Sequence, residues 1–79
     1  MDRTLVSHEK LLKLLNSELS KHEECNNCHV TSVVRLIDED EDGCNWYSGN
    51  LRCSGVSLDV CSPIANQIIA QAKIKFNVK

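Results

Sequence analysis

Residues 30–53 decide the fold, and they run VTSVVRLIDEDEDGCNWYSGNLRC. Residues 30–37 are rich in β-branched side chains, which predicts a strand. Residues 38–43 are acidic and end in glycine, which predicts a solvated turn. A second extended stretch covers roughly residues 44–53, and the sequence around 48–50 predicts a bulge or a further tight turn within it. We therefore expect an antiparallel hairpin in which the numbers of facing residues sum to about 81.

A helix is predicted on each side of this hairpin. Before it, leucines recur at helical spacing and predict a helix over residues 4–23. After it, Ser62 and Pro63 fit an N-cap and a first helical position, and we expect the second helix to extend to about Phe76. Residues 74–79 also alternate with period two, as in a strand. The expected fold is α+β: helix, antiparallel β-hairpin of two to three strands, helix, in a single domain of residues 1–79.

Composition narrows the classes of protein. With 79 residues, the chain buries a modest core and is expected to need additional stabilisation, such as a bound metal or an oligomer contact. The net charge of −2 argues against binding to nucleic acid or to an anionic membrane surface. No apolar run is long enough to span a bilayer, and the first residues lack a signal-peptide pattern, so we expect a cytoplasmic protein. Five cysteines, an odd number, fit a reducing compartment better than a disulfide framework.

The cysteines carry the clearest chemical signal. Cys25-x-x-Cys28 has the spacing of a zinc knuckle, in which two thiolates share one tight turn. In the expected register Cys53 faces Cys28. Cys61 lies just before the predicted second helix, where the helix dipole and free amides favour a thiolate. These positions predict a zinc site with four ligands: Cys25, Cys28, Cys53 and Cys61.

Cys44 is the remaining cysteine. In the same register it faces Ile37, at the far end of the hairpin from the knuckle. If residues 48–50 form a true hairpin turn instead, Cys44 opposes Cys53 and replaces Cys61 as the fourth ligand. The sequence leaves both ligand sets open.

The order of knuckle, hairpin and a ligand near a helix start resembles a treble-clef or zinc-ribbon arrangement over residues 25–70. It departs from that pattern because it lacks a second Cys-x-x-Cys. The chain also resembles small bacterial cysteine-containing proteins that have a leucine-rich first helix and a Cys-x-x-Cys. The shared stretches here are DGCNW at residues 42–46 and RCSG at residues 52–55. Neither resemblance implies an activity.

Two other cofactors are suggested by short strings and are not expected. Residues 25–29 match the c-type haem attachment string, but there is no export signal and a strand is predicted to follow, so covalent haem is disfavoured. Residues 38–43 match the first half of a calcium loop. Its twelfth position is Gly49 rather than a bidentate acid, so a solvated acidic turn is expected instead of calcium.

The sequence contains no complete catalytic constellation, which favours a non-enzymatic protein. We expect a zinc-stabilised domain that acts through a protein partner and binds neither nucleic acid nor membrane. The alternative is a thiol-based redox or electron-transfer protein that uses Cys25 and Cys28. Trp46 and Tyr47 are adjacent, so on a strand they point to opposite faces, one toward the core and one toward a possible partner.

Overall fold

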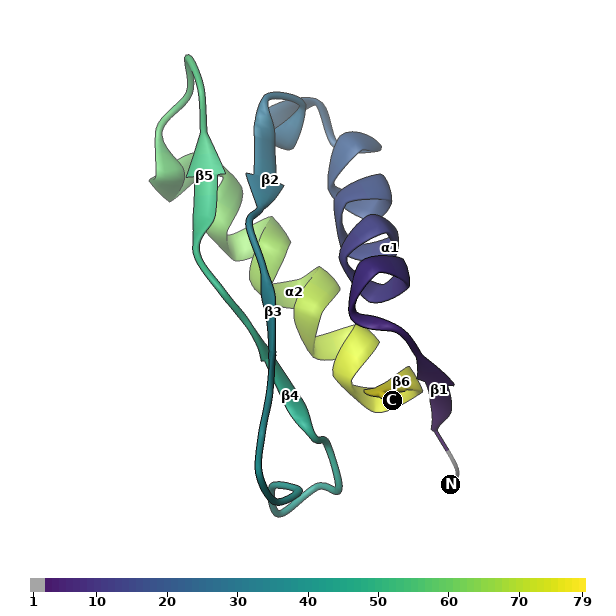
Figure 1. Ribbon diagram of the computed structural model, residues 1–79. Coiled ribbons are helices and arrows are strands. Elements are labelled where there is room, and N and C mark those ends of the chain that lie inside the picture. The colour runs from purple at the N-terminus through teal and green to yellow at the C-terminus, as the bar shows by residue number, and fades with distance from the viewer. Residues whose placement is uncertain (1–2) are drawn as a thin grey trace.

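The computed structural model describes residues 3–79 (Figure 1). It is a small α+β fold, as the sequence predicts, in which two helices pack beside a long, twisted hairpin. The elements in chain order are β1 (Thr4–Val6), α1 (His8–Ser20), the 3-10 turn η1 (Glu23–Cys25), β2 (Cys28–Val30), β3 (Val33–Arg35), β4 (Trp46–Ser48), β5 (Leu51–Cys53), α2 (Leu58–Lys75) and β6 (Phe76–Val78).

The hairpin has the register that the sequence predicts. β2 pairs antiparallel with β5, so that Cys28 faces Cys53. β3 pairs antiparallel with β4, so that Val34 faces Tyr47. In both ladders the numbers of facing residues sum to 81, which makes the four strands two lengths of one hairpin. The acidic turn therefore lies at one end, and the Cys28–Cys53 pair at the other (Figure 1).

The predicted bulge or turn at residues 48–50 is wrong. The register is unchanged on both sides of Gly49, so no residue is inserted, and the chain does not reverse there. The Gly49 amide donates to the Ser32 carbonyl oxygen at 2.7 Å. A Cβ on Gly49 would collide with the Ser32 side chain. Glycine marks a close approach between the two strands at this point, and glycine in a strand commonly has that role.

The predicted first helix begins too early. Ser7 is the N-cap of α1, because its hydroxyl accepts a hydrogen bond from the Lys10 amide at 3.1 Å. The three residues before it form β1 and not a helical turn. α1 ends at Ser20, short of the predicted residue 23. The leucine spacing identified the buried face of the helix, but the serine hydroxyl decides where the helix starts.

The start of the second helix was also predicted wrongly. α2 begins at Leu58 after the N-cap Ser57, whose hydroxyl accepts from the Asp59 amide at 3.2 Å. Pro63 lies inside the helix, and Cys61 is in the first turn instead of before it. Pro63 lies past the first turn, where proline removes one hydrogen bond of the helix, so the Ser57 cap sets the boundary and Pro63 does not.

The ends of the chain form a parallel pair that the sequence did not predict. β1 pairs with β6 in the register Thr4 to Phe76 and Val6 to Val78. The period-two alternation noted at residues 74–79 corresponds to this last strand. The helix–hairpin–helix order is therefore incomplete, since a strand precedes the first helix and another follows the second.

The buried side chains fall into two clusters. The tryptophan core consists of Val6, Leu11, Leu15, Cys44, Trp46, Ala72 and Val78. The cysteine core consists of Leu19, Cys25, Cys28, Val30, Cys61 and Ala65. Trp46 is fully buried while Tyr47 is 46% exposed, so the two aromatic residues point to opposite faces as expected.

Candidate functional site: a four-cysteine cluster

Four segments bring cysteines to the end of the hairpin farthest from the acidic turn. Cys25 ends η1 and Cys28 begins β2, so the Cys-x-x-Cys spans the tight connection between α1 and the hairpin. Cys53 ends β5, and Cys61 lies in the first turn of α2. This is the same set of four that the sequence predicted as metal ligands.

The four cysteines are joined in pairs. Cys25 is bonded to Cys61, with Cα atoms 5.2 Å apart, and Cys28 is bonded to Cys53 across the hairpin, with Cα atoms 4.0 Å apart. One disulfide therefore fastens η1 to α2, and the other clamps the open end of the hairpin. Neither disulfide joins Cys25 to Cys28, the pair on which the alternative redox hypothesis was based.

The two disulfides differ in their access to solvent. Cys25 and Cys61 are 0% exposed, and the surrounding cysteine core covers their bond. Cys28 is 7% exposed, while Cys53 is only partly buried at the end of β5. Of the two disulfides, Cys28–Cys53 is therefore the more accessible, through the partly exposed residue Cys53.

Three of the sulfurs also lie close enough to share a metal ion. The Sγ atoms of Cys28, Cys53 and Cys61 are all within 4.8 Å of one another. Zinc binds thiolates, however, and a sulfur engaged in a disulfide is not a thiolate. The two disulfides therefore argue against bound zinc in this state of the protein.

Cys44 is not part of the cluster. It is a buried free thiol in the tryptophan core, and it donates to the Trp46 carbonyl oxygen at 3.4 Å. The alternative ligand set with Cys44 in place of Cys61 required a chain reversal at residues 48–50. Because the strands continue through that point, Cys44 stays at the opposite end of the hairpin from Cys53.

The two cysteines of the haem attachment string, Cys25 and Cys28, have no free thiol in this structure. Covalent attachment needs both cysteines of the motif as thioethers, and here each is bonded to another cysteine. His29 is exposed on β2. The residues after it form a strand, as the sequence predicted.

In the acidic turn, one carboxylate organises the backbone. Asp40 Oδ1 accepts from the amides of Cys44 at 3.0 Å and Asp42 at 2.9 Å. The hydrogen bond from the Cys44 amide is the main reason that the pKa of Asp40 lies below its usual value, and Lys73 and Arg3 add favourable charge interactions. Gly43 completes the turn with φ +86°, a conformation that glycine adopts readily. These contacts fit the predicted role as a solvated turn.

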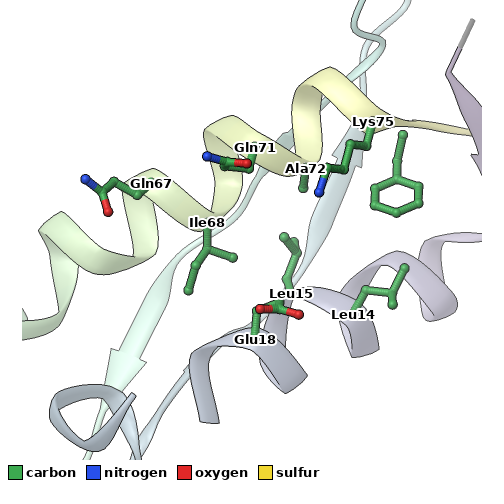
Figure 2. A pocket seen from close by; sticks show the side chains of 9 residues that line it. Leu14, Leu15, Glu18, Gln67, Ile68, Gln71, Ala72 and Lys75 are labelled. Carbon is green, nitrogen blue, oxygen red and sulfur yellow. The ribbon is translucent and has the colours of Figure 1, made fainter. Parts of the chain in front are cut away.

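A groove of about 390 Å³ runs between the two helices (Figure 2). Leu15 of α1 and Ile68 of α2 point toward each other across it, and Ala72 lies farther along α2. Glu18 and Lys75 place charges at its border. No cysteine lines this groove, so it is separate from the four-cysteine cluster.

Sequence reasoning found the four cysteines but not their bonds. The signal was present, because the predicted register put Cys28 opposite Cys53, and directly opposed strand positions lie within disulfide reach. The odd number of cysteines argued the other way. It misled because Cys44 packs in a different cluster, which leaves an even set of four.

No family model, curated protein or solved structure matches this chain. In the part of the chain that the structure describes, neither helix has the length and apolar character needed to cross a membrane.

Proposed function

We propose that this protein is a non-enzymatic domain that acts through protein–protein contacts on the outer face of its hairpin. The observation that carries the proposal is an apolar pair on that face. Val34 and Tyr47 lie directly opposite each other in the β3–β4 ladder and are 36% and 46% exposed. Ile37, a few residues farther along, is 101% exposed. Tyrosine is enriched in the centres of protein interfaces, and Val34 gives Tyr47 an exposed apolar neighbour.

The charge around this patch suggests what the partner looks like. Five consecutive acidic residues, 38–42, follow Ile37 directly. A partner with an apolar centre and a basic rim would match both features. The same acidic run repels phosphates, so we propose a protein and neither a nucleic acid nor an anionic membrane as the partner.

A photo-crosslinking amino acid in place of Tyr47, introduced in the native host, tests this proposal. We expect a protein adduct of defined mass that disappears when Val34→Asp is added. The matched control carries the crosslinker at Lys13, an exposed position on α1. The proposal fails if positions 47 and 13 give the same adducts, or if the adduct at position 47 is a nucleic acid.

The alternative function, a thiol-based redox protein, is supported by a different observation. The Cys28–Cys53 disulfide is partly exposed at Cys53 and lies beside a second disulfide. We propose that any redox role uses this pair and not Cys25 with Cys28. Zinc also remains a proposal, for the reduced chain only, with the same four cysteines as ligands. It is supported by the closeness of the Cys28, Cys53 and Cys61 sulfurs.

A further inference from the structure

The four-cysteine cluster has the dimensions of two different chemical states. In a tetrahedral zinc site with Zn–S bonds of about 2.3 Å, neighbouring sulfurs lie about 3.8 Å apart. Among the Cys28, Cys53 and Cys61 sulfurs, the bonded Cys28–Cys53 pair would have to move apart to that spacing after reduction. The distances to the Cys61 sulfur, which are within 4.8 Å, would have to shorten by about 1 Å at most. The fourth sulfur, on Cys25, is bonded to Cys61 and is released next to these three sulfurs when that bond is reduced.

The surroundings favour one set of ligands in the reduced state. Cys25 and Cys28 keep the spacing of a zinc knuckle at the start of β2, and Cys53 faces Cys28 through the hairpin register. Cys61 is held against them by the packing of α2 in the cysteine core. Because these positions are set by backbone elements as well as by sulfur–sulfur bonds, a metal ion has a partly organised site to enter.

We propose that the cluster is a redox-gated site for one zinc ion, closed when it holds two disulfides and open when it holds four thiols. This inference rests on the zinc proposal for the reduced chain and adds its regulation. Each disulfide takes two electrons and two protons from one dithiol reductant, which becomes a disulfide itself. Zinc then displaces up to four protons from the four thiols and binds as a tetrathiolate.

Reoxidation reverses the process. Two molecules of a small disulfide, such as oxidised glutathione, accept four electrons from the four thiolates, form the two protein disulfides and leave as four thiols after taking up four protons. Zinc loses its ligands in this step and is released. The chain therefore binds zinc under reducing conditions and releases it under oxidising conditions.

The unequal burial of the two disulfides gives the opening an order. A thiolate of a dithiol reductant attacks the sulfur of the partly exposed residue Cys53, and Cys28 leaves as a thiolate. The second thiol of the reductant then displaces Cys53 as a thiol and closes the disulfide of the reductant. The freed Cys28 thiolate lies within 4.8 Å of the Cys61 sulfur and attacks it, which forms a Cys28–Cys61 bond and releases Cys25. This exchange opens the buried Cys25–Cys61 disulfide from inside the cysteine core. A second dithiol then reduces the new Cys28–Cys61 bond by attack at Cys28, which is 7% exposed.

The gating is tested by zinc analysis of the full chain in two redox states. We expect no zinc in the oxidised protein, about one zinc per chain after reduction and zinc addition, and release of that zinc when oxidised glutathione is added. Cobalt in place of zinc should give the visible absorption of a tetrahedral thiolate site. Cys44→Ser is the matched control and should retain the metal, whereas Cys28→Ser should lose it.

The outcomes separate the two proposals. If the reduced protein binds no zinc, the zinc proposal and its gating both fail. If the reduced protein binds zinc but oxidised glutathione does not release it, or if the oxidised protein binds it equally well, only the gating fails. Loss of zinc in Cys44→Ser would show that the ligand set is wrong.

The order of opening has its own test. Limited reduction followed by alkylation and mass spectrometry should find a species with Cys53 and Cys25 alkylated and a Cys28–Cys61 disulfide. A first species with alkylated Cys25 and Cys61, and an intact Cys28–Cys53 disulfide, would overturn the proposed order. These assignments do not depend on metal binding, so the test of the order remains valid even if the reduced protein binds no zinc.

Discussion

At the cysteine core, two disulfides join η1, α2 and the open end of the hairpin, whereas the tryptophan core has no covalent link and depends on packing and hydrogen bonds. Trp46 is 0% exposed, and its indole Nε1 donates to the Phe76 carbonyl oxygen at 2.9 Å. Asn45 donates to the Val78 carbonyl oxygen and accepts from the Val78 amide, each at 2.8 Å. The stability of the first region therefore depends on whether its disulfides are intact, while that of the second depends on noncovalent contacts.

The two regions are stabilised differently because they join different parts of the chain. β1 and β6 bring the two ends of the described chain into the tryptophan core, where backbone amides and carbonyls need partners. Asn45 and Asn77 supply those partners with their side chains. The cysteine core has to hold the open end of a hairpin against two helices. Two crosslinks achieve this where the buried residues are few and small.

The largest expected effect is complete reduction in the presence of a chelator. The Cys28–Cys53 bond closes a 25-residue separation, which contributes about 3.5 kcal/mol by loop entropy. With that bond in place, Cys25–Cys61 closes an effective loop of about 11 residues and adds roughly 3 kcal/mol. A loss of about 6 kcal/mol is at least half the stability of a domain of this size. We expect the melting temperature, followed by far-UV circular dichroism, to fall by more than about 20 °C.

The matched variant for this prediction removes one crosslink. Cys28→Ser combined with Cys53→Ser leaves Cys25–Cys61 in place and should melt between the oxidised and the fully reduced proteins. If reduction leaves the melting temperature unchanged, the disulfides do not hold the cysteine core together and the contrast between the two regions is lost.

Trp46→Ala should give the next largest effect. It removes the largest buried side chain of the tryptophan core and is expected to cost about 3–5 kcal/mol, measured by urea unfolding of the oxidised protein. Ile37→Ala is the control, because that side chain is fully exposed, and should change stability by less than about 0.5 kcal/mol. Equal effects of the two substitutions would contradict the placement of Trp46.

Asn77→Ala tests the polar part of the same region. The Asn77 side chain donates to the Gly43 carbonyl oxygen at 3.0 Å and accepts from the Asn45 amide at 3.2 Å. Asn77 is 8% exposed, so its loss leaves both groups without a partner and should cost about 2 kcal/mol in urea unfolding. Asn26→Ala, at an exposed asparagine next to Cys25, should be nearly neutral. A neutral Asn77→Ala would show that water replaces these bonds.

The smallest expected effect concerns pH. The pKa of Asp40 is lowered in the folded state, mainly by the Cys44 amide, so its carboxylate stabilises the fold above the ordinary value of 3.8. This contribution is lost as the pH falls from about 4 through the lower folded pKa. Asp40→Asn keeps an acceptor that does not titrate, so its urea midpoint should decline less than that of wild type between pH 5 and about pH 2. Glu41→Gln, at an exposed neighbour, is the control. An identical decline in wild type and Asp40→Asn would refute this role.

Much of the fold could be predicted from local patterns. β-branched residues and the acidic turn defined the hairpin, and counting along it gave the register that places Cys28 opposite Cys53. Leucine spacing found the buried face of α1, of which Leu11, Leu15 and Leu19 are the buried members. These signals work because side-chain periodicity follows directly from backbone geometry.

The helix ends and terminal strands could not be predicted in the same way. Ser7 and Ser57 cap their helices through single hydrogen bonds, and for α2 the pair Ser62-Pro63 offered an equally good start in the sequence. β1 and β6 are three residues each, and they pair with each other from opposite ends of the described chain. Their pairing depends on where α1 and α2 place them, which no local pattern contains.

The candidate site also has a part that local sequence patterns predict and a part that depends on tertiary packing. The sequence by itself determined that Cys25, Cys28 and Cys53 meet, because the knuckle spacing and the hairpin register are local properties of the chain. It left the fourth member open between Cys61 and Cys44. Only the tertiary structure decided how they pair, since the packing of α2 brings Cys61 to Cys25 and leaves Cys44 in the other core. Spacing along a chain specifies which sulfurs can approach one another, but the bonds they form depend on distances set by helix packing and on the redox state around them.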